Sequence, residues 1–263
     1  MDFNINIITS TQNEKVKLAY GLQNRARTRR KEMRIALEGV KLVRDALERG
    51  HKPTFILYDP EAITKDVLKS LKKHAPNGEY IAVSPEVMQH IAEAEQPQGI
   101  IGVFPLPVPP LPRNPTRVLI LDEVSDPGNM GTIFRTAAAS GVECVLLSPN
   151  CADPYNPKVL RSGMGAHFRL PIIEAKWFEI QNYCQPLKVY VAMGEGDTRY
   201  DKVDWRENWA LIIGNEGHGV SEESLALATA KIYIPMSKET ESLNAGIATG
   251  VILFEAARQR FVG

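Results

Sequence analysis

Short apolar runs alternate with amphipathic stretches along the first hundred residues. Three of the runs are rich in β-branched and aromatic residues and predict strands, at 55–58, 80–83 and 99–104. Apolar residues at helical spacing predict helices before and between them, at 16–22, 39–49, 61–74 and 85–94. The spacing of Thr11 and Glu14 is that of a capping box at the start of the first helix. The pattern predicts a small α/β domain.

The second half of the chain contains apolar runs without strict alternation, as expected of strands that are buried on both faces. These runs lie at 117–121, 144–147, 189–192, 209–213 and 231–234. Helical patterns separate them, so we expect an α/β domain with a mostly parallel sheet covered by helices on both faces. Ligands of such sheets bind outside the carboxyl ends of the strands.

A proline-rich segment separates the two halves. Residues 105–115 hold six of the 18 prolines in the chain, and proline fixes φ and favours an extended backbone. We therefore expect a first domain at 1–104, a linker at 105–116 and a second domain at 117–263.

Charge is distributed unevenly, although the chain of 263 residues has a formal net charge of zero. Between residues 15 and 34, eight basic side chains are opposed by one acidic side chain, Glu32, which gives a local net charge of +7. Such a stretch attracts a nucleic-acid backbone, although a solvated helix face shows the same pattern. The candidate phosphate contacts are Lys15, Lys17, Arg25, Arg27, Arg29, Arg30 and Lys31.

The remaining composition, 44% hydrophobic and 24% charged residues, is ordinary for a soluble globular protein. Cys144, Cys151 and Cys184 have neither CxxC spacing nor a nearby histidine cluster, which predicts reduced thiols in a cytoplasmic protein and no metal site. Residues 2–30 show no signal-peptide pattern, and the longest apolar run, 245–254, is about half as long as a membrane span. We expect no membrane association.

Three polar, glycine-containing segments follow strands of the predicted parallel sheet, at the edge where such a sheet binds ligands. In the first segment Asp126 begins a turn, and Asn129 can cap a helix that brings Asn129, Thr132 and Arg135 near one face. An amide and a guanidinium at a helix start suit a phosphate. A simple cap and a surface ion pair would use the same residues.

The second segment, 214–221, contains closely spaced glycines, which let the backbone approach a flat ligand but also form plain turns. Ser221 stands where the next helix is expected to begin. His218 has no partners at triad or metal-ligand spacing, which favours a structural role.

The third segment follows the strand predicted at 231–234. Ser242 and Asn244 stand at the entry to a helix with the small residues Ala245, Gly246, Ala248 and Gly250. Small residues allow close packing on a loop or on a partner subunit. A capped helix with a tight packing face has this pattern whatever the function is.

In order and spacing the three segments resemble the motifs of the SpoU-type (TrmH-like) RNA 2′-O-ribose methyltransferases of the SPOUT superfamily. The matching residues are Asn129 with Arg135, the run Gly214-Asn-Glu-Gly-His-Gly219, and Ile234-Pro-Met with Ser242-Leu-Asn244. The loop at 237–241 departs from many relatives, which have a glycine shortly after the methionine. Residues 10–17 and 36–39 are similar to the ribosomal-protein-like substrate-binding domain that many members carry.

The resemblance implies that the motif loops meet in a deep trefoil knot near the C-terminus. It also implies a homodimer formed through the second domain and S-adenosylmethionine as the methyl donor, held largely by backbone groups. The implied cofactor-binding residues are Ala192, Met193, Gly194, Gly214, Asn215, Gly217, Gly219, Ile234, Met236 and Leu243.

The implied reaction is methyl transfer to a ribose 2′-hydroxyl without a metal, and the implied catalytic residues are Arg135, Asn129, Glu216, Ser242 and Asn244. Because a guanidinium has a pKa above about 12 and is a poor base, we expect Arg135 to clamp the phosphate and oxyanion, with Glu216 orienting it. A role of Arg135 as base stays open. By analogy with members that carry an added N-terminal domain, we expect ribosomal RNA as substrate rather than transfer RNA.

Two other functions are compatible with parts of the pattern. A dinucleotide-dependent oxidoreductase would need GxGxxG after the first strand of the parallel sheet, but the residues after Leu121 read Asp-Glu-Val-Ser-Asp-Pro-Gly-Asn. An RNA-binding protein without activity would be expected to lack Arg135 or Asn244, and both are present.

Overall fold

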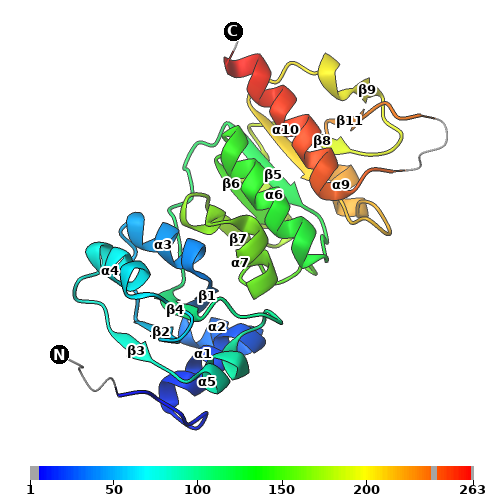
Figure 1. The fold of residues 1–263 in the computed structure, drawn as a ribbon. Coiled ribbons are helices and arrows are strands. Elements are labelled where there is room, and N and C mark those ends of the chain that lie inside the picture. Colours follow the sequence, from blue (N-terminus) through cyan, green and yellow to red (C-terminus); the bar gives the residue numbers. More distant parts are fainter. Residues whose placement is uncertain (1–5, 238–241, 262–263) are drawn as a thin grey trace. The chain divides into compact units, whose positions relative to one another are not determined.

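The computed structural model describes residues 6–237 and 242–261 and divides the chain into two compact units (Figure 1). The first unit comprises residues 1–107 together with 155–161, and the second comprises 108–154 and 162–263. Residues 238–241 include most of the loop that departs from the family pattern, so that loop lies outside the described residues. None of the described helices is long and apolar enough to cross a membrane.

The first unit contains a four-stranded sheet with the order β1-β4-β2-β3. Its strands are β1 (Arg34–Glu38), β2 (Phe55–Tyr58), β3 (Tyr80–Ala82) and β4 (Ile100–Pro105). Its helices are α1 (Glu14–Asn24), α2 (Ala26–Glu32), α3 (Val40–Glu48), α4 (Lys65–His74) and α5 (Pro85–Ile91). The α/β domain expected from the pattern is confirmed, but β1 was missed because charged residues flank its short apolar run.

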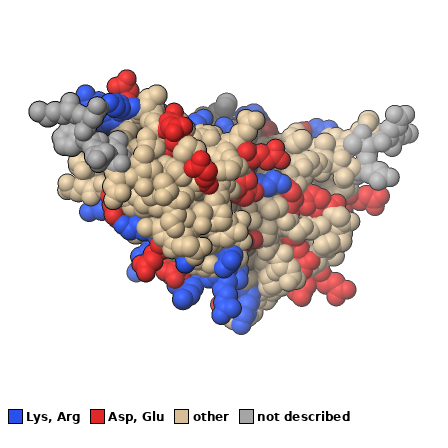
Figure 2. All heavy atoms as spheres, turned by 60° about the horizontal axis from the view of Figure 1, so that its bottom comes forward, with Lys and Arg blue, Asp and Glu red and all other residues tan. Residues whose placement is uncertain are grey.

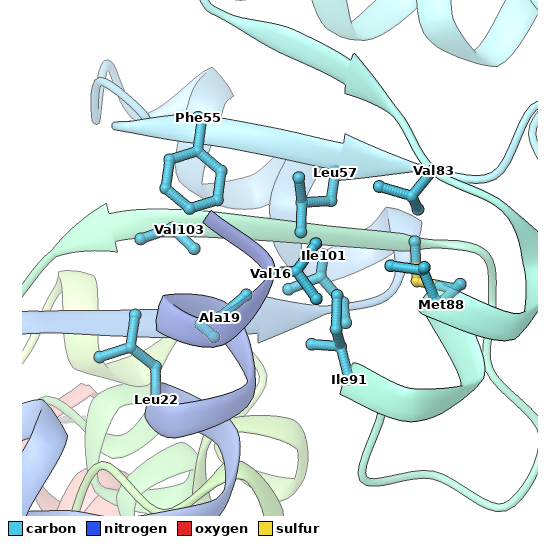
Figure 3. Packing of buried hydrophobic residues seen from close by; sticks show 12 residues of the cluster. Val16, Ala19, Leu22, Phe55, Leu57, Val83, Met88, Ile91, Ile101 and Val103 are labelled. Carbon is cyan, nitrogen blue, oxygen red and sulfur yellow. The ribbon is translucent and has the colours of Figure 1, made fainter. Parts of the chain in front are cut away.

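A hydrophobic core joins α1 and α5 to the sheet of the first unit (Figure 3). Val16 and Leu22 of α1 and Ile91 of α5 are fully buried beside Leu57 of β2 and Val103 of β4. The amphipathic spacing of the two helices therefore places their apolar faces on the sheet.

The start of α1 differs from the expected capping box. Asn13 is the N-cap, and its side-chain oxygen accepts a hydrogen bond from the Lys15 N–H at 2.9 Å. The prediction that Thr11 caps the helix was wrong, because Asn13 can perform the same role two residues later.

The second unit contains a seven-stranded sheet in which all strands are parallel, with the order β7-β6-β5-β10-β8-β11-β9. The five expected strands are β5 (Arg117–Leu121), β6 (Cys144–Leu147), β8 (Lys188–Ala192), β10 (Trp209–Ile213) and β11 (Ala230–Tyr233). The edge strands β7 (Ile172–Glu174) and β9 (Thr198–Arg199) were not predicted, because so few residues carry no clear pattern.

Helices α6 (Pro127–Ser140), α7 (Pro157–Gly163), α8 (Trp177–Cys184), α9 (Glu222–Leu227) and α10 (Ala245–Phe261) follow the strands of this half of the chain. Helices α6 and α10 pack side by side (Figure 1). A methyl group added at Gly246 of α10 would lie 3.3 Å from the Thr132 side chain of α6, so the small residues serve this contact. The trefoil knot stays a prediction.

Candidate active site

A pocket of about 240 Å³ lies at the carboxyl ends of β8, β10 and β11. All but one of the expected cofactor-binding residues line it: Ala192, Met193, Gly194, Gly214, Asn215, Gly219, Ile234, Met236 and Leu243. Gly217 is not a lining residue. Glu216 and Ser242 also line the pocket, and α10 adds Ala245, Ala248 and Ile252, which were not predicted. The pocket therefore forms at the sheet edge that the sequence indicated.

A network of polar side chains joins the three motif segments beside this pocket. The side-chain amide of Asn129 donates a hydrogen bond to the Glu216 carboxylate. The side-chain amide of Asn244 donates to the side-chain oxygen of Asn129 at 2.8 Å. The side-chain oxygen of Asn244 accepts from the backbone N–H of Gly246 at 3.0 Å, so Asn244 also caps α10. Asn129 is thus held at both ends of its amide.

The start of α6 frees Asn129 for this network. Asp126 is the N-cap of the helix, and its carboxylate accepts a hydrogen bond from the backbone N–H of Asn129 at 2.7 Å. The expectation that Asn129 itself caps the helix was wrong. Because an aspartate three residues earlier satisfies the helix start, the Asn129 side chain is available to the site.

Arg135 is exposed on α6 and has no hydrogen bond or ion pair with any described residue. Glu216, which was expected to orient Arg135, bonds to Asn129 in this structure. The guanidinium therefore remains available for an external anion.

The loop between β10 and α9 is closed by two backbone hydrogen bonds, Asn215 N–H to Gly219 O at 2.8 Å and Gly219 N–H to Asn215 O at 3.0 Å. Gly219 has φ +79°, a conformation that favours glycine. A Cβ at Gly214 would lie 2.5 Å from both the Gly219 carbonyl oxygen and a Val220 methyl. Gly214 is thus required for tight closure of a loop that lines the pocket.

Glu123 holds this loop in place through hydrogen bonds, a role that the sequence did not indicate. Its backbone oxygen accepts from the Asn215 side chain at 2.7 Å, and its carboxylate accepts from Asn150 and contacts His218 Nε2, both at 2.9 Å. The hydrogen bonds from Asn150 and then His218 lower the pKa of Glu123. His218 thus contacts a residue that holds the loop, and the structural role that its isolation in the sequence favoured stays a prediction.

Asp122, at the end of β5, is fully buried and anchors the start of α9. Its carboxylate accepts from the Ser221 N–H at 2.6 Å and from the Ser224 hydroxyl at 2.7 Å. Ser221 is the N-cap of α9, as expected. A buried carboxyl group that accepts several hydrogen bonds is held in one position and fixes the far end of the pocket loop.

The predicted phosphate contacts of the first unit differ in how exposed their side chains are. Arg29 is 4% exposed, and its guanidinium donates to the carbonyl oxygens of Leu22 and Gln23 at 2.6 and 3.3 Å. Its assignment as a phosphate contact was wrong, because it satisfies carbonyls at the end of α1. Lys15 pairs with Glu79. The candidates with exposed side chains are Lys17, Arg25, Arg27, Arg30 and Lys31.

Lys and Arg side chains also gather at the lower edge of the face shown in Figure 2.

Among the residues that the structure describes, no group of three or more His, Cys, Asp or Glu side chains is placed to hold a metal. The cysteines are free, and burial raises the pKa of Cys144 to about 11 and that of Cys184 to about 12, so both are unreactive thiols.

Comparison with known proteins decides the family. Residues 116–254 match the SpoU rRNA Methylase family, and residues 13–102 match the MRM3-like substrate binding domain. The chain belongs to the SpoU rRNA methylase family. The network of Asn129, Glu216 and Asn244 is therefore built from the motif residues of a SpoU methylase, as the resemblance implied.

Relatives of this SpoU methylase include rRNA methyltransferase 3, mitochondrial, of Mus musculus, which is 34% identical over 88% of this chain and 69% of its own length. The 23S rRNA (guanosine(2553)-2'-O)-methyltransferase RlmP of Bacillus subtilis is 32% identical over 94% of this chain and 97% of its own length. Both matches extend over the two units of the SpoU methylase.

Solved structures of SpoU methyltransferases share the fold. AviRb from Streptomyces viridochromogenes in complex with AdoMet has a TM-score of 0.87 and 27% identity, covering 96% of this chain and 100% of AviRb. The AdoMet bound rRNA methyltransferase from Sinorhizobium meliloti has a TM-score of 0.82 and 32% identity, covering 97% and 98%. The expected SpoU fold with an added N-terminal domain is confirmed.

Proposed function

We propose that this chain transfers the methyl group of S-adenosylmethionine to the 2′-hydroxyl of a ribose in ribosomal RNA. The observation that carries the proposal is the Glu216–Asn129–Asn244 network, which joins the three motif segments beside the pocket. Two relatives are named as 23S rRNA 2′-O-methyltransferases, and two solved neighbours hold AdoMet. These names support both the donor and the substrate class.

The pocket residues fit S-adenosylmethionine, which supplies a methyl group on a positively charged sulfur. Ile234, Met236 and Leu243 give the pocket an apolar wall that suits a flat ring. Gly214 and Gly219 leave backbone groups accessible at another wall. The Glu216 carboxylate lines the same pocket and suits a cationic ligand.

The residues around the pocket hold the RNA phosphate and position the reacting groups. The ribose hydroxyl must lose its proton as the new carbon–oxygen bond forms, and the adjacent phosphate must be held in place. The exposed Arg135 guanidinium, without a partner among the described residues, supports its role as a phosphate clamp. Asn129 and Asn244 fix the Glu216 carboxylate at the pocket.

Methyl transfer from labelled S-adenosylmethionine to ribosomal and transfer RNA tests the function. We expect label on the ribose of ribosomal RNA, identified by its alkali-resistant linkage. Arg135→Ala should lower kcat by about 100-fold or more, since a lost oxyanion or phosphate donor costs roughly this factor. Arg135→Lys should recover part of the rate, because it retains the charge without the planar fork. Arg113→Ala removes another exposed arginine and should leave the rate unchanged.

Two results would contradict the proposal. Wild-type protein that binds S-adenosylmethionine but labels only bases, or neither RNA class, would exclude ribose methylation of ribosomal RNA. An Arg135→Ala variant with the wild-type rate would exclude the clamp and leave the rest of the site in place.

The apolar face of α10 supports a homodimer formed through the second unit. Ile247, Phe254 and Phe261 recur every seven residues and are 57%, 53% and 78% exposed, so one side of α10 offers a stripe to a second copy. Sedimentation equilibrium should show a dimer that Phe254→Glu converts to monomer. Phe178→Glu, at an equally exposed site on α8, should not change the mass. A monomeric wild type would exclude this pairing.

The first unit supplies the RNA-binding surface in this proposal, corresponding to the domain expected at 1–104. Its exposed cations Lys17, Arg25, Arg27, Arg30 and Lys31 suit phosphate contacts, which position RNA without reading its sequence. The second unit then performs the transfer. The cytoplasmic location expected from the sequence stays a prediction.

A further inference from the structure

Three side chains of the first unit form a stack beside the corner between α1 and α2. The rings of Tyr20 on α1 and His90 on α5 lie parallel, with centroids 4.6 Å apart and planes 8° apart. The guanidinium carbon of Arg25, which links α1 to α2, lies 5.9 Å from the Tyr20 ring centroid. Planar groups from three points of the chain are thus gathered at one place.

The polar atoms of this stack are not used by the fold. Among the described residues, the Tyr20 hydroxyl, the His90 ring nitrogens and the Arg25 guanidinium make no hydrogen bond and no ion pair. His90 and Arg25 are exposed, and Tyr20 is half-buried. These atoms are therefore available to a ligand from solution.

Packing of α1 on α5 does not require the stack. Val16, Ala19 and Leu22 of α1 share a buried core with Met88 and Ile91 of α5, and neither Tyr20 nor His90 belongs to that core (Figure 3). The rings lie next to the core but outside it. A structural role thus leaves their exposure and their unused polar atoms without explanation.

The surroundings of the stack are cationic. Helix α2 begins directly after Arg25 and carries the exposed residues Arg27, Arg30 and Lys31. The acidic residue one turn before His90 on α5 is Glu86, which is exposed. Exposed aromatic faces beside arginines form the surface that binds unpaired nucleotides, because bases stack on the rings while cations hold the phosphates.

We propose that Tyr20, His90 and Arg25 form a stacking platform for one unpaired base of the substrate RNA. The inference rests on the proposed function in taking RNA as the substrate, and it goes further in stating which feature of the RNA is bound. A base inside a duplex has no free face, so the platform selects a loop, bulge or strand end. The platform belongs to the first unit, and the residues that line the methyl-transfer pocket belong to the second.

Binding of two labelled RNAs by the full chain tests the platform. Fluorescence anisotropy gives the Kd for a stem–loop with an unpaired loop and for a fully paired duplex of equal length. Wild type should prefer the stem–loop. His90→Ala should raise the Kd for the stem–loop about tenfold, within the range for loss of one base–aromatic stack, and leave the duplex Kd unchanged. Tyr20→Ala removes the ring on which His90 is stacked and should change the two Kd values in the same way.

Matched variants separate stacking from charge and from folding. Tyr20→Phe keeps the ring and should therefore keep the preference for the stem–loop. His74→Ala removes a histidine of α4 outside the stack and should bind both RNAs as wild type does. Because a stack neutralises no phosphate, Tyr20→Ala should shift the stem–loop Kd equally at all salt concentrations, whereas Arg27→Ala should flatten the salt dependence.

Three results would overturn the platform: equal binding of the two RNAs by wild type, an equal loss of affinity for both RNAs in Tyr20→Ala and His90→Ala, or no loss in either variant. If Tyr20→Ala fails to fold, the exposed His90→Ala decides by itself. Failure of the proposed function is seen separately, as absence of methyl transfer to ribosomal RNA by wild type whatever the anisotropy shows.

Discussion

Replacement of Gly214 by alanine tests whether tight closure of the loop between β10 and α9 forms the cofactor pocket. The added methyl group would lie 2.5 Å from the Gly219 carbonyl oxygen and 2.5 Å from a Val220 methyl, where ordinary contact begins at 3.4 Å. The loop would have to open by about 0.9 Å. The two bonds between Asn215 and Gly219 oppose such opening, because both hold Gly219 in place.

The substitution is expected to lower both the stability of the fold and the affinity for S-adenosylmethionine. Overpacking costs about 1–3 kcal/mol, and loss of one of the two loop hydrogen bonds adds about 1 kcal/mol. If binding has to close the loop again, the overpacking cost of about 1–3 kcal/mol corresponds to a rise in Kd of about 10- to 100-fold. Because Gly214, Asn215 and Gly219 all line the pocket, the Kd for S-adenosylmethionine should rise by about this factor.

Isothermal titration calorimetry with S-adenosylmethionine measures the effect directly. Gly217→Ala is the matched control in the same loop, since its methyl group would meet only the Asn215 side-chain oxygen, at 3.3 Å, and Gly217 does not line the pocket. The control should bind within about twofold of wild type. Wild-type affinity in Gly214→Ala, or equal losses in both variants, would refute the reasoning about loop closure.

Two further predictions concern other parts of the chain. Arg29→Ala should lower the free energy of unfolding, measured by urea denaturation, by about 2 kcal/mol, because buried carbonyls lose their donor. The exposed control Arg27→Ala should leave this free energy unchanged. A larger loss of stability in Arg27→Ala than in Arg29→Ala would contradict the assignment of Arg29 to the fold. Burial lowers the pKa of His167 from 6.5 to about 4, so its neutral form stabilises the fold above pH 6.5, and this contribution, on the order of 3 kcal/mol, is lost as the pH falls from 6.5 through 4. Unfolding of wild type and His167→Gln between pH 7.5 and 4 measures it, and equal pH dependence in both would contradict this origin.

Sequence alone predicted the elements whose pattern is set by burial. The five long strands of the second unit are apolar because both faces of their sheet are covered, and this signal persists without any knowledge of neighbours. Strand β1 was missed because only three apolar residues lie between its charged ends, Arg34 and Glu38. Strand β9 was missed because it has only two residues. Local pattern fails where an element is short.

For the candidate site, the sequence predicted the position of the segments but not the hydrogen-bond partners within them. The three motif segments could be placed at one sheet edge from strand order, and the pocket lies there. The partners could not be predicted, because several residues can satisfy the same donor. Asp126 rather than Asn129 caps α6, and Glu216 bonds to Asn129 rather than to Arg135. Glu123 owes its role to neighbours that lie more than 20 residues away in sequence, Asn150 and His218.

The brevity of β7 and β9 has a consequence for how copies of the chain meet. These strands form the two edges of the seven-stranded sheet and contain three and two residues. A sheet edge this short presents too few free backbone donors and acceptors to template a strand from another molecule, which protects against edge-to-edge aggregation. Two copies are therefore expected to meet through helix surfaces, and a continuous intermolecular sheet is disfavoured even at high concentration.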